Sequence, residues 1–301
     1  MKLREWLQHA ESVLADGPHA DRARLDAEML LLHHIGKNKA WIMAHGEEEF
    51  AGCPSIGYAA LLERRRKGEP MQYITGECEF YGLPFHVSPE VLIPRPETEH
   101  LVEQVLELTR IGSARLEPRA ARPEPETTNP DGPLRILDVG TGSGAIIIAL
   151  ATQLPGANLT AVDISEPALD IARQNATRNN VGDRIRFLQS DLLAAVAGER
   201  FEIVISNPPY VPDSDRALIA VEVREHEPHI ALFGGQDGLE VYRRLIPAAQ
   251  AALLSGGYLV FEFGFSQQQD IEGLLARAGF ESIEFVSDLQ GIPRVASARR
   301  P

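Results

Sequence analysis

The C-terminal part of the chain alternates short apolar runs with segments of helical periodicity, and this alternation constrains the fold more than any other feature. The runs at 134–140 (LRILDVG) and 201–206 (FEIVIS) have the composition of buried strands, whereas 167–179 (PALDIARQNATRN) has apolar residues at helical spacing. Strands that alternate with helices predict a mostly parallel sheet with helices on both faces. We therefore predict an α/β fold with a doubly wound sheet.

The first part of the chain has a different pattern, and 301 residues exceed the usual length of one domain, about 100 to 200 residues. Apolar residues recur at helical spacing in 23–36 and in 58–68, and both segments end at a glycine. We predict a helical substrate-recognition domain at 1–70, a β-hairpin linker at 71–93, the α/β domain at 94–301, and a flexible loop inside it at 112–133, which is rich in Pro and charge.

Charge and cysteine content argue against several functions. The net charge of −14 is unfavourable for a partner held through its phosphates, and the basic run RRRK at 64–67 is better explained as a solvated helix face. We expect no stable nucleic-acid partner. Two cysteines without paired spacing, Cys53 and Cys78, predict a reducing compartment and no metal site. No apolar stretch approaches ~18 residues and the N-terminal segment lacks a signal peptide's apolar core, so we expect a cytoplasmic protein without a membrane partner.

Three glycines follow the first α/β strand in the segment LDVGTGSGA at 137–145, directly before a helix. Glycines at such a turn let a ligand approach the backbone and let the helix pack closely on the sheet. Their spacing is G-x-G-x-G, not the G-x-G-x-x-G of dinucleotide enzymes. Asp163 ends the next strand, where a carboxylate can accept hydrogen bonds from ribose hydroxyls. Its alternative role is a helix N-cap, which Ser165 fills more naturally.

Two further strand ends carry acids. Asp138 precedes the glycines, where it could face the amino group of a cofactor with an amino-acid tail, and Asp191 with Leu192 ends the third strand, where they could contact an adenine amino group and ring. Because the carboxyl ends of parallel strands share one edge of the sheet, these side chains should meet there. A nucleoside with an amino-acid tail fits them better than a pyrophosphate. The predicted cofactor-binding residues are Asp138, Gly140, Thr141, Gly142, Ser143, Gly144, Asp163, Asp191, Leu192 and Asn207.

The fourth strand, at 201–206, is followed by an Asn, two prolines and a Tyr at 207–210. Proline lacks a backbone N–H and holds the residue before it in an extended conformation. The corner therefore offers the Asn207 and Pro208 carbonyls and the Asn207 amide, with few local donors to use them. Such a corner suits a ligand that donates hydrogen bonds. The alternative is a Pro-rich strand exit without a chemical role.

The glycine turn, the acids and this corner resemble the Rossmann-like methyltransferases that use S-adenosylmethionine, in which such a motif after the fourth strand marks enzymes that methylate a planar nitrogen. The segments at 70–103, 137–146, 206–211 and 224–246 are similar to the protein-(glutamine-N5) methyltransferases of peptide chain release factors, and 254–264 continues the similarity. The resemblance implies S-adenosylmethionine as the cofactor, release factors as protein partners, and the Gln of their Gly-Gly-Gln motif as the substrate. A GGQ at 234–236 of this chain is attributed to chance.

The resemblance also implies roles for the corner. Asn207, Pro208 and Tyr210 would be catalytic and, together with Pro209, would bind the substrate amide. The Asn207 side-chain oxygen and the Pro208 carbonyl would each accept one amide N–H, with Tyr210 packed against the amide plane. Arg95 and Glu97 would either shape the pocket or brace the domain junction. The alternatives are glutamine methylation of a ribosomal protein, adenine-N6 methylation of nucleic acid, and noncatalytic binding of S-adenosylmethionine.

Overall fold

The computed structural model describes residues 2–49, 56–115 and 132–301. Cys53 and the greater part of the predicted loop at 112–133 lie outside these ranges. The chain divides into two compact units, one formed by Met1–Glu77 with Leu218–Glu227, the other by Cys78–Ala217 with Pro228–Pro301. The segment at 218–227 thus packs with the first unit although it follows the fourth predicted strand. In the described ranges, no helix is both long enough and apolar enough to cross a membrane.

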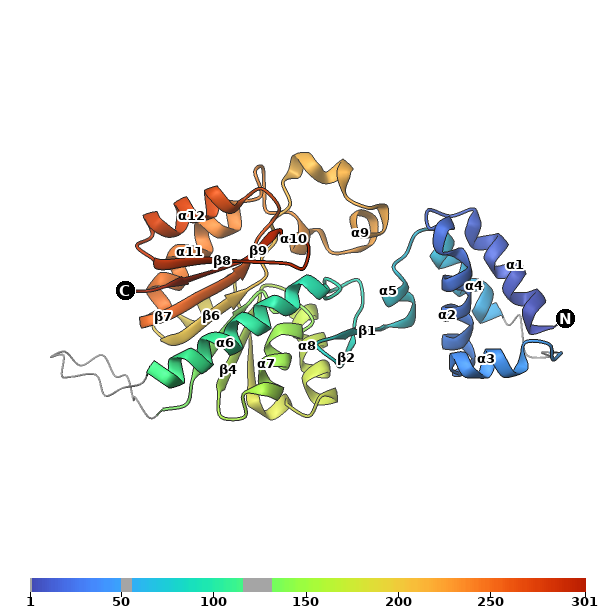
Figure 1. The fold of residues 1–301 in the computed structure, drawn as a ribbon, viewed down its shortest axis with the longest axis horizontal. Helices are drawn as coiled ribbons and strands as arrows, with labels where there is room; N and C mark the ends of the chain where they lie inside the picture. Colours follow the sequence, from blue (N-terminus) through green and yellow to red (C-terminus); the bar gives the residue numbers. More distant parts are fainter. Residues whose placement is uncertain (1, 50–55, 116–131) are drawn as a thin grey trace. The chain divides into compact units, whose positions relative to one another are not determined.

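The first unit is a small helical bundle (Figure 1). One face of its first helix buries Leu3, Leu7, Ala10 and Leu14, which recur at helical spacing, in a core shared with the second and fourth helices. Gly36 ends the second helix in the left-handed conformation, with φ of 62°, as its place in the sequence predicts. The elements are α1 (Leu3–Ala15), η1 (Ala20–Arg22), α2 (Ala23–Ile35), α3 (Lys39–His45), α4 (Ile56–Arg66), α5 (Met71–Thr75) and α9 (Val221–His226).

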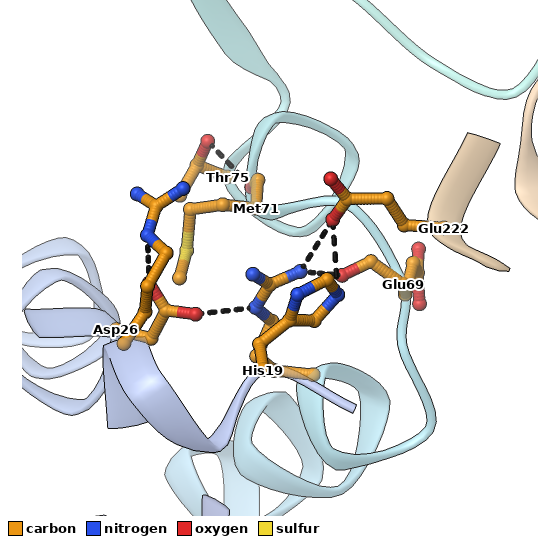
Figure 2. A network of polar contacts seen from close by, with 8 residues as sticks. His19, Asp26, Glu69, Met71, Thr75 and Glu222 are labelled. Carbon is orange, nitrogen blue, oxygen red and sulfur yellow. Dashed lines mark hydrogen bonds and ion pairs between the residues drawn. The ribbon is translucent and has the colours of Figure 1, made fainter. Parts of the chain in front are cut away.

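A buried ion pair joins the helices of this unit (Figure 2). Arg65, 3% exposed, donates from Nε to Oδ2 of Asp26 at 2.6 Å, and Asp26 is 1% exposed. The Arg65 Nη1 also donates to the Glu69 carbonyl at 2.9 Å and to Glu222 Oε2 at 3.1 Å. The other members of the basic run at 64–67 are paired with Glu63 or Glu69. Arg64, Arg66 and Lys67 thus lie on a solvated face, as predicted, with each paired to an acid, whereas Arg65 is buried in the core.

The segment predicted as a hairpin over 71–93 begins instead with a helix. Met71 and Ile74, one turn apart, are buried in the core of the first unit, and Gly76, with φ of 76°, ends α5. The β-branched and aromatic composition concealed this spacing. The hairpin itself is shorter, with strands β1 (Glu77–Phe80) and β2 (Leu83–His86). Its two-residue turn has positive φ at Tyr81 and Gly82, as tight hairpins require.

The second unit is built on a seven-stranded sheet in the order β5-β4-β3-β6-β7-β9-β8. The first five strands of this order pair in parallel, and β9 runs antiparallel to both of its neighbours. The order reverses between β3 and β6, which is where open α/β sheets bind ligands. The strands are β3 (Arg135–Val139), β4 (Asn158–Asp163), β5 (Ile185–Gln189), β6 (Phe201–Ser206), β7 (Leu253–Glu262), β8 (Glu281–Ser287) and β9 (Pro293–Arg299).

Helices cover both faces of this sheet, as a doubly wound fold requires (Figure 1). Successive strand residues point to opposite faces, so Ile136 joins the core under α6 and α7, whereas Leu137 joins the core under α11 and α12. The predicted loop starts late, because α6 continues to Arg115. The remaining elements are η2 (Pro96–Thr98), α6 (Glu99–Arg115), α7 (Ala145–Gln153), α8 (Glu166–Arg178), η3 (Gly182–Arg184), η4 (Ala194–Val196), η5 (Asp213–Leu218), α10 (His229–Leu232), α11 (Glu240–Ala252) and α12 (Gln268–Arg277).

Candidate active site

A pocket of about 310 Å³ lies at the carboxyl ends of β3, β4, β5 and β6. The segments that follow these strands supply most of its wall, and residues from 90–98 and 228–231 close it. The predicted site residues that follow these strands therefore lie together at one edge of the sheet. The lining includes Arg95, Thr98, Gly140, Thr141, Gly142, Ser143, Asp163, Ser165, Ser190, Asp191, Leu192, Ser206, Asn207, Pro208 and Pro209.

The glycine turn after β3 is held against β4 by its backbone. The Val162 carbonyl accepts hydrogen bonds from the N–H groups of Gly140 (2.8 Å) and Thr141 (3.0 Å). At Gly144, where φ is +82°, an added Cβ would lie 2.8 Å from Ile148 Cδ1 and 3.2 Å from Ala172 Cβ. This glycine therefore permits the close approach of α7 and α8, and it places the start of α7 at the pocket.

Asp163 lines the pocket and also braces the turn. Its Oδ2 accepts from the Gly142 N–H at 2.8 Å and its Oδ1 from the Ser165 N–H at 2.9 Å. Ser165 caps α8 by accepting from Ala168 N at 3.3 Å, so the N-cap role belongs to Ser165. Burial raises the pKa of Asp163 against the effect of these N–H donors. Each carboxylate oxygen keeps a second lone pair, with which it can accept from a ligand hydroxyl.

Asp138 lies behind the pocket wall and not in it. It is fully buried and accepts from Thr141 Oγ1 at 2.7 Å, while its other oxygen, Oδ1, is buried and has no hydrogen-bond partner among the residues that the structure describes. Burial raises the pKa of Asp138 to about 7, and the Thr141 hydrogen bond opposes that rise. A buried acceptor without a donor is costly. An ammonium group bound near Thr141 would supply a favourable charge, so the turn fits a cofactor with an amino-acid tail.

Asp191 and Leu192 lie at the far end of the lining. The Asp191 carboxylate is half exposed and pairs with Arg244 at 2.6 Å, a cation that the sequence did not connect with it. Leu192 has a positive φ of 51°, unusual for a branched side chain, and faces the same wall. Ser190, which sequence reasoning missed, lines the pocket and accepts from Ala195 N at 2.9 Å.

The corner at 207–210 begins where Ser206 ends β6 and donates to the Val139 carbonyl at 2.7 Å. Asn207 Nδ2 donates to Thr98 Oγ1 at 3.1 Å. Among the described residues, nothing donates a hydrogen bond to Asn207 Oδ1 or to the Pro208 carbonyl. Two acceptors on adjacent residues are thus left at the pocket for an incoming donor.

Tyr210, predicted to pack against the plane of the substrate amide, is the last residue of the corner. It lies outside the pocket lining, and its hydroxyl donates to Glu262 Oε1 at 3.2 Å. Burial, followed by the Glu262 charge, raises the pKa of Tyr210. Asn207, Pro208 and Pro209 are brought together at the pocket, whereas Tyr210 supports them from behind in this structure.

Two glycines of the FGGQDG segment at 233–238 hold the corner in place. A Cβ on Gly234 would lie 2.5 Å from the Pro209 carbonyl oxygen, and one on Gly238 would collide with the Tyr210 carbonyl. Val211 donates to Leu232 and accepts from Gly234 across a short parallel bridge. This packing explains the glycine of the GGQ triplet that approaches the corner. The three glycines within the six residues at 233–238 could have indicated a close approach of two backbone segments, but the sequence analysis considered only the likeness of GGQ to the substrate motif.

The segment at 94–99 contributes to the pocket through three residues, the first of which is Pro94. Arg95 and Thr98 line it, whereas Glu97 does not. Thr98 Oγ1 donates to Glu262 Oε2 at 2.6 Å, and both residues are buried. Neither Thr98 nor Glu262 was singled out from the sequence, because nothing local links positions so far apart in the chain.

Comparison with known proteins gives consistent matches. Residues 5–76 match the family described as PrmC N-terminal domain, and residues 127–225 match the one described as Methyltransferase small domain. A release factor glutamine methyltransferase of Koribacter versatilis is 41% identical over 98% of this chain and 96% of its own length. One from Escherichia coli is 38% identical over 99% of each chain. The catalytic domain of hMettl16, solved in complex with MAT2A 3'UTR hairpin 6, has a TM-score of 0.53 at 16% identity, covering 81% and 82% of the two chains, which shows the fold alone.

The sheet order, the glycine turn and the corner after β6 define a Rossmann-like methyltransferase, whose cofactor is S-adenosylmethionine. The identity to relatives over nearly the full length decides the branch within that class. The chain belongs to the release factor glutamine methyltransferase family.

Proposed function

We propose that this protein methylates the side-chain amide nitrogen of the Gln in the Gly-Gly-Gln motif of peptide chain release factors. The observation that carries the proposal is the pair of adjacent acceptors, Asn207 Oδ1 and the Pro208 carbonyl, at the wall of the cofactor pocket. A primary amide has two N–H donors on one nitrogen, which matches two acceptors held side by side. The names of the relatives support a release factor as the protein that carries this amide.

The cofactor, when bound, supplies an electrophilic methyl group on a sulfonium. Asn207 and Pro208 orient the substrate nitrogen, because two acceptors at fixed angles restrict the rotation of its NH₂ group. They also withdraw positive charge from that nitrogen as the new bond forms. Orientation of this kind can lower a barrier by roughly 7 to 11 kcal/mol in favourable cases. A strong base is not required, because attack of the neutral nitrogen on the methyl group gives an N-methylated amide cation, which is strongly acidic and loses one of its N–H protons to water, leaving the neutral methylamide.

Four residues are proposed to hold the cofactor in named ways. Gly140 and Gly142 give it access to the backbone of the turn, and Asp163 accepts from its ribose hydroxyls. Asp138 attracts its amino group from behind Thr141. Gly144, Ser143, Asp191, Leu192 and Asn207 complete the proposed cofactor-binding set. Each assignment rests on the position of the residue in or directly behind the pocket wall.

The helical unit is proposed to recognise the body of the release factor, and we propose no stable nucleic-acid partner. The pairing of the basic run at 64–67 with acidic side chains supports this view, since it leaves little unpaired positive charge there. A protein substrate of the translation machinery also accords with a cytoplasmic enzyme.

The test uses a panel of acceptors with labelled S-adenosylmethionine: a release factor, total ribosomal proteins, and adenine-containing DNA and RNA. Label on the release factor alone is expected. Label on a ribosomal protein would transfer the proposal to that substrate, and label on nucleic acid would overturn it.

A further inference from the structure

A chain of hydrogen bonds lies directly behind the 207–210 corner. Asn207 Nδ2 donates to Thr98 Oγ1 (3.1 Å), Thr98 Oγ1 donates to Glu262 Oε2 (2.6 Å), and Tyr210 OH donates to Glu262 Oε1 (3.2 Å). The sheet brings these groups together, because Ser206, the last residue of β6, pairs with Phe261 of β7, and the next residues along the chain are Asn207 and Glu262. Tyr242 donates to the Glu262 carbonyl at 2.8 Å and so anchors its backbone.

The direction of each hydrogen bond in this chain is fixed by the acid at its end. Both oxygens of Glu262 accept from hydroxyl groups, and in its ionised form the carboxylate can only accept, so the single hydroxyl proton of Thr98 then goes to Glu262. The distance of 2.6 Å is typical of a strong hydroxyl–carboxylate bond. Thr98 Oγ1 can then only accept from Asn207, which must present Nδ2 to it. The Asn207 oxygen is consequently left facing the pocket.

The surroundings of Glu262 fit this role. It is 3% exposed, and burial raises the pKa of Glu262, while the Thr98 and Tyr210 hydroxyls and the Arg294 charge act in the opposite direction. Removing a carboxylate from water is costly, and the two hydroxyl groups that donate to Glu262 offset part of that cost. Thr98 is 4% exposed, and within this chain of hydrogen bonds Glu262 is the acceptor for its hydroxyl proton.

We propose that Glu262 and Thr98 are positioning residues that set the orientation of the Asn207 amide, so that its oxygen, and not its NH₂, meets the substrate. The inference rests on the proposed role of Asn207 as an acceptor for the substrate amide. If the Asn207 amide were reversed, its NH₂ group would face the NH₂ group of the substrate amide. The substrate nitrogen would then lose one of its two hydrogen-bond acceptors.

The experiment compares Thr98→Val, which removes the hydroxyl at nearly constant shape, with Thr98→Ser, which keeps it, in the full-length enzyme with a release factor as substrate. Thr98→Val is expected to lower kcat about tenfold, while KM for the release factor and Kd for S-adenosylhomocysteine stay within about twofold. Thr98→Ser should keep most of the wild-type kcat. Glu262→Gln should resemble Thr98→Val, because its amide can donate to Thr98 and so reverse the chain.

A double-mutant cycle separates positioning from general structural damage. If Thr98 acts through Asn207, adding Thr98→Val to Asn207→Ala should not lower kcat further. An additional tenfold loss in the double variant, a wild-type kcat in Thr98→Val, or equal loss in Thr98→Ser would overturn the inference. If the wild-type enzyme did not methylate the release factor, or if Asn207→Ala had a normal kcat, the proposed function would instead be refuted. Should Glu262→Gln fail to fold, the two Thr98 variants decide the matter.

Discussion

Replacing Gly144 by Ala tests the account of the cofactor turn, and Gly279 provides a matched control. Both glycines have φ of +82°, so alanine at either site adopts the same left-handed backbone, at about 1–2 kcal/mol. Both substitutions also restrict the unfolded chain to the same extent, which offsets about 0.4–1 kcal/mol. The sites differ in space: a Cβ at 144 would lie 2.8 Å from Ile148 Cδ1 and 3.2 Å from Ala172 Cβ, whereas one at 279 meets nothing within 4 Å.

The backbone terms therefore cancel in the comparison, and the difference between the variants measures overpacking. Forcing a methyl group into a filled site costs about 1–3 kcal/mol. Gly144→Ala should lower the free energy of unfolding by that much more than Gly279→Ala, as measured by urea unfolding followed by circular dichroism. It should also weaken S-adenosylhomocysteine binding in calorimetry, since α7 must move at the pocket. Equal destabilisation by the two substitutions, or an unchanged affinity in Gly144→Ala, would refute the reasoning.

Three further predictions concern the corner, the buried acid and the helical unit. Asn207→Ala should lower single-turnover methyl transfer ~10²-fold, because it removes one acceptor used in the transition state, while the S-adenosylhomocysteine Kd rises far less, because the other proposed cofactor contacts remain; full turnover would contradict its role. Because the carboxyl of Asp138 ionises only as pH rises through about 7, cofactor affinity should increase between pH 6 and 7.5, and Asp138→Asn should abolish that increase in calorimetry. Arg65→Met should destabilise the helical unit by about 3 kcal/mol in hydrogen exchange, since it removes the close cation of the buried Asp26 and leaves only Arg22, at 3.9 Å, whereas Arg66→Met should have little effect; equal protection in both would contradict the burial argument.

Much of the fold was predictable because it rests on local patterns. The alternation of strands and helices, the glycine turn and the helix end at Gly36 each depend on residues close together in the chain. The sheet order was not readable from such patterns, since the insertion of β9 between β7 and β8 depends on long-range pairing. The helix α5 was missed because Met71 and Ile74, which are buried one turn apart, stand among β-branched and aromatic neighbours.

The site was predictable to the same extent. The residues that face the pocket follow the ends of strands, so Asp163, Asp191 and Asn207 could be placed from the sequence. The residues that set their geometry could not, because Thr98 and Glu262 are brought to Asn207 only by the register of β6 and β7. The same holds for Arg244, which joins Asp191 from α11. Burial also separates Asp138 from the pocket wall in a way that its position before the glycines does not reveal.

The central claim is that the corner holds an amide by its two N–H groups, and one measurement tests it most directly. The enzyme is given labelled S-adenosylmethionine and either a release factor or the same factor with the Gln of its Gly-Gly-Gln motif replaced by Glu, and the site of the label is mapped by mass spectrometry. Glu keeps the shape of the side chain but has no N–H to donate. The account predicts label on the Gln nitrogen and none on the Glu variant; label on the Glu carboxylate, or undiminished label elsewhere in the variant, would contradict it.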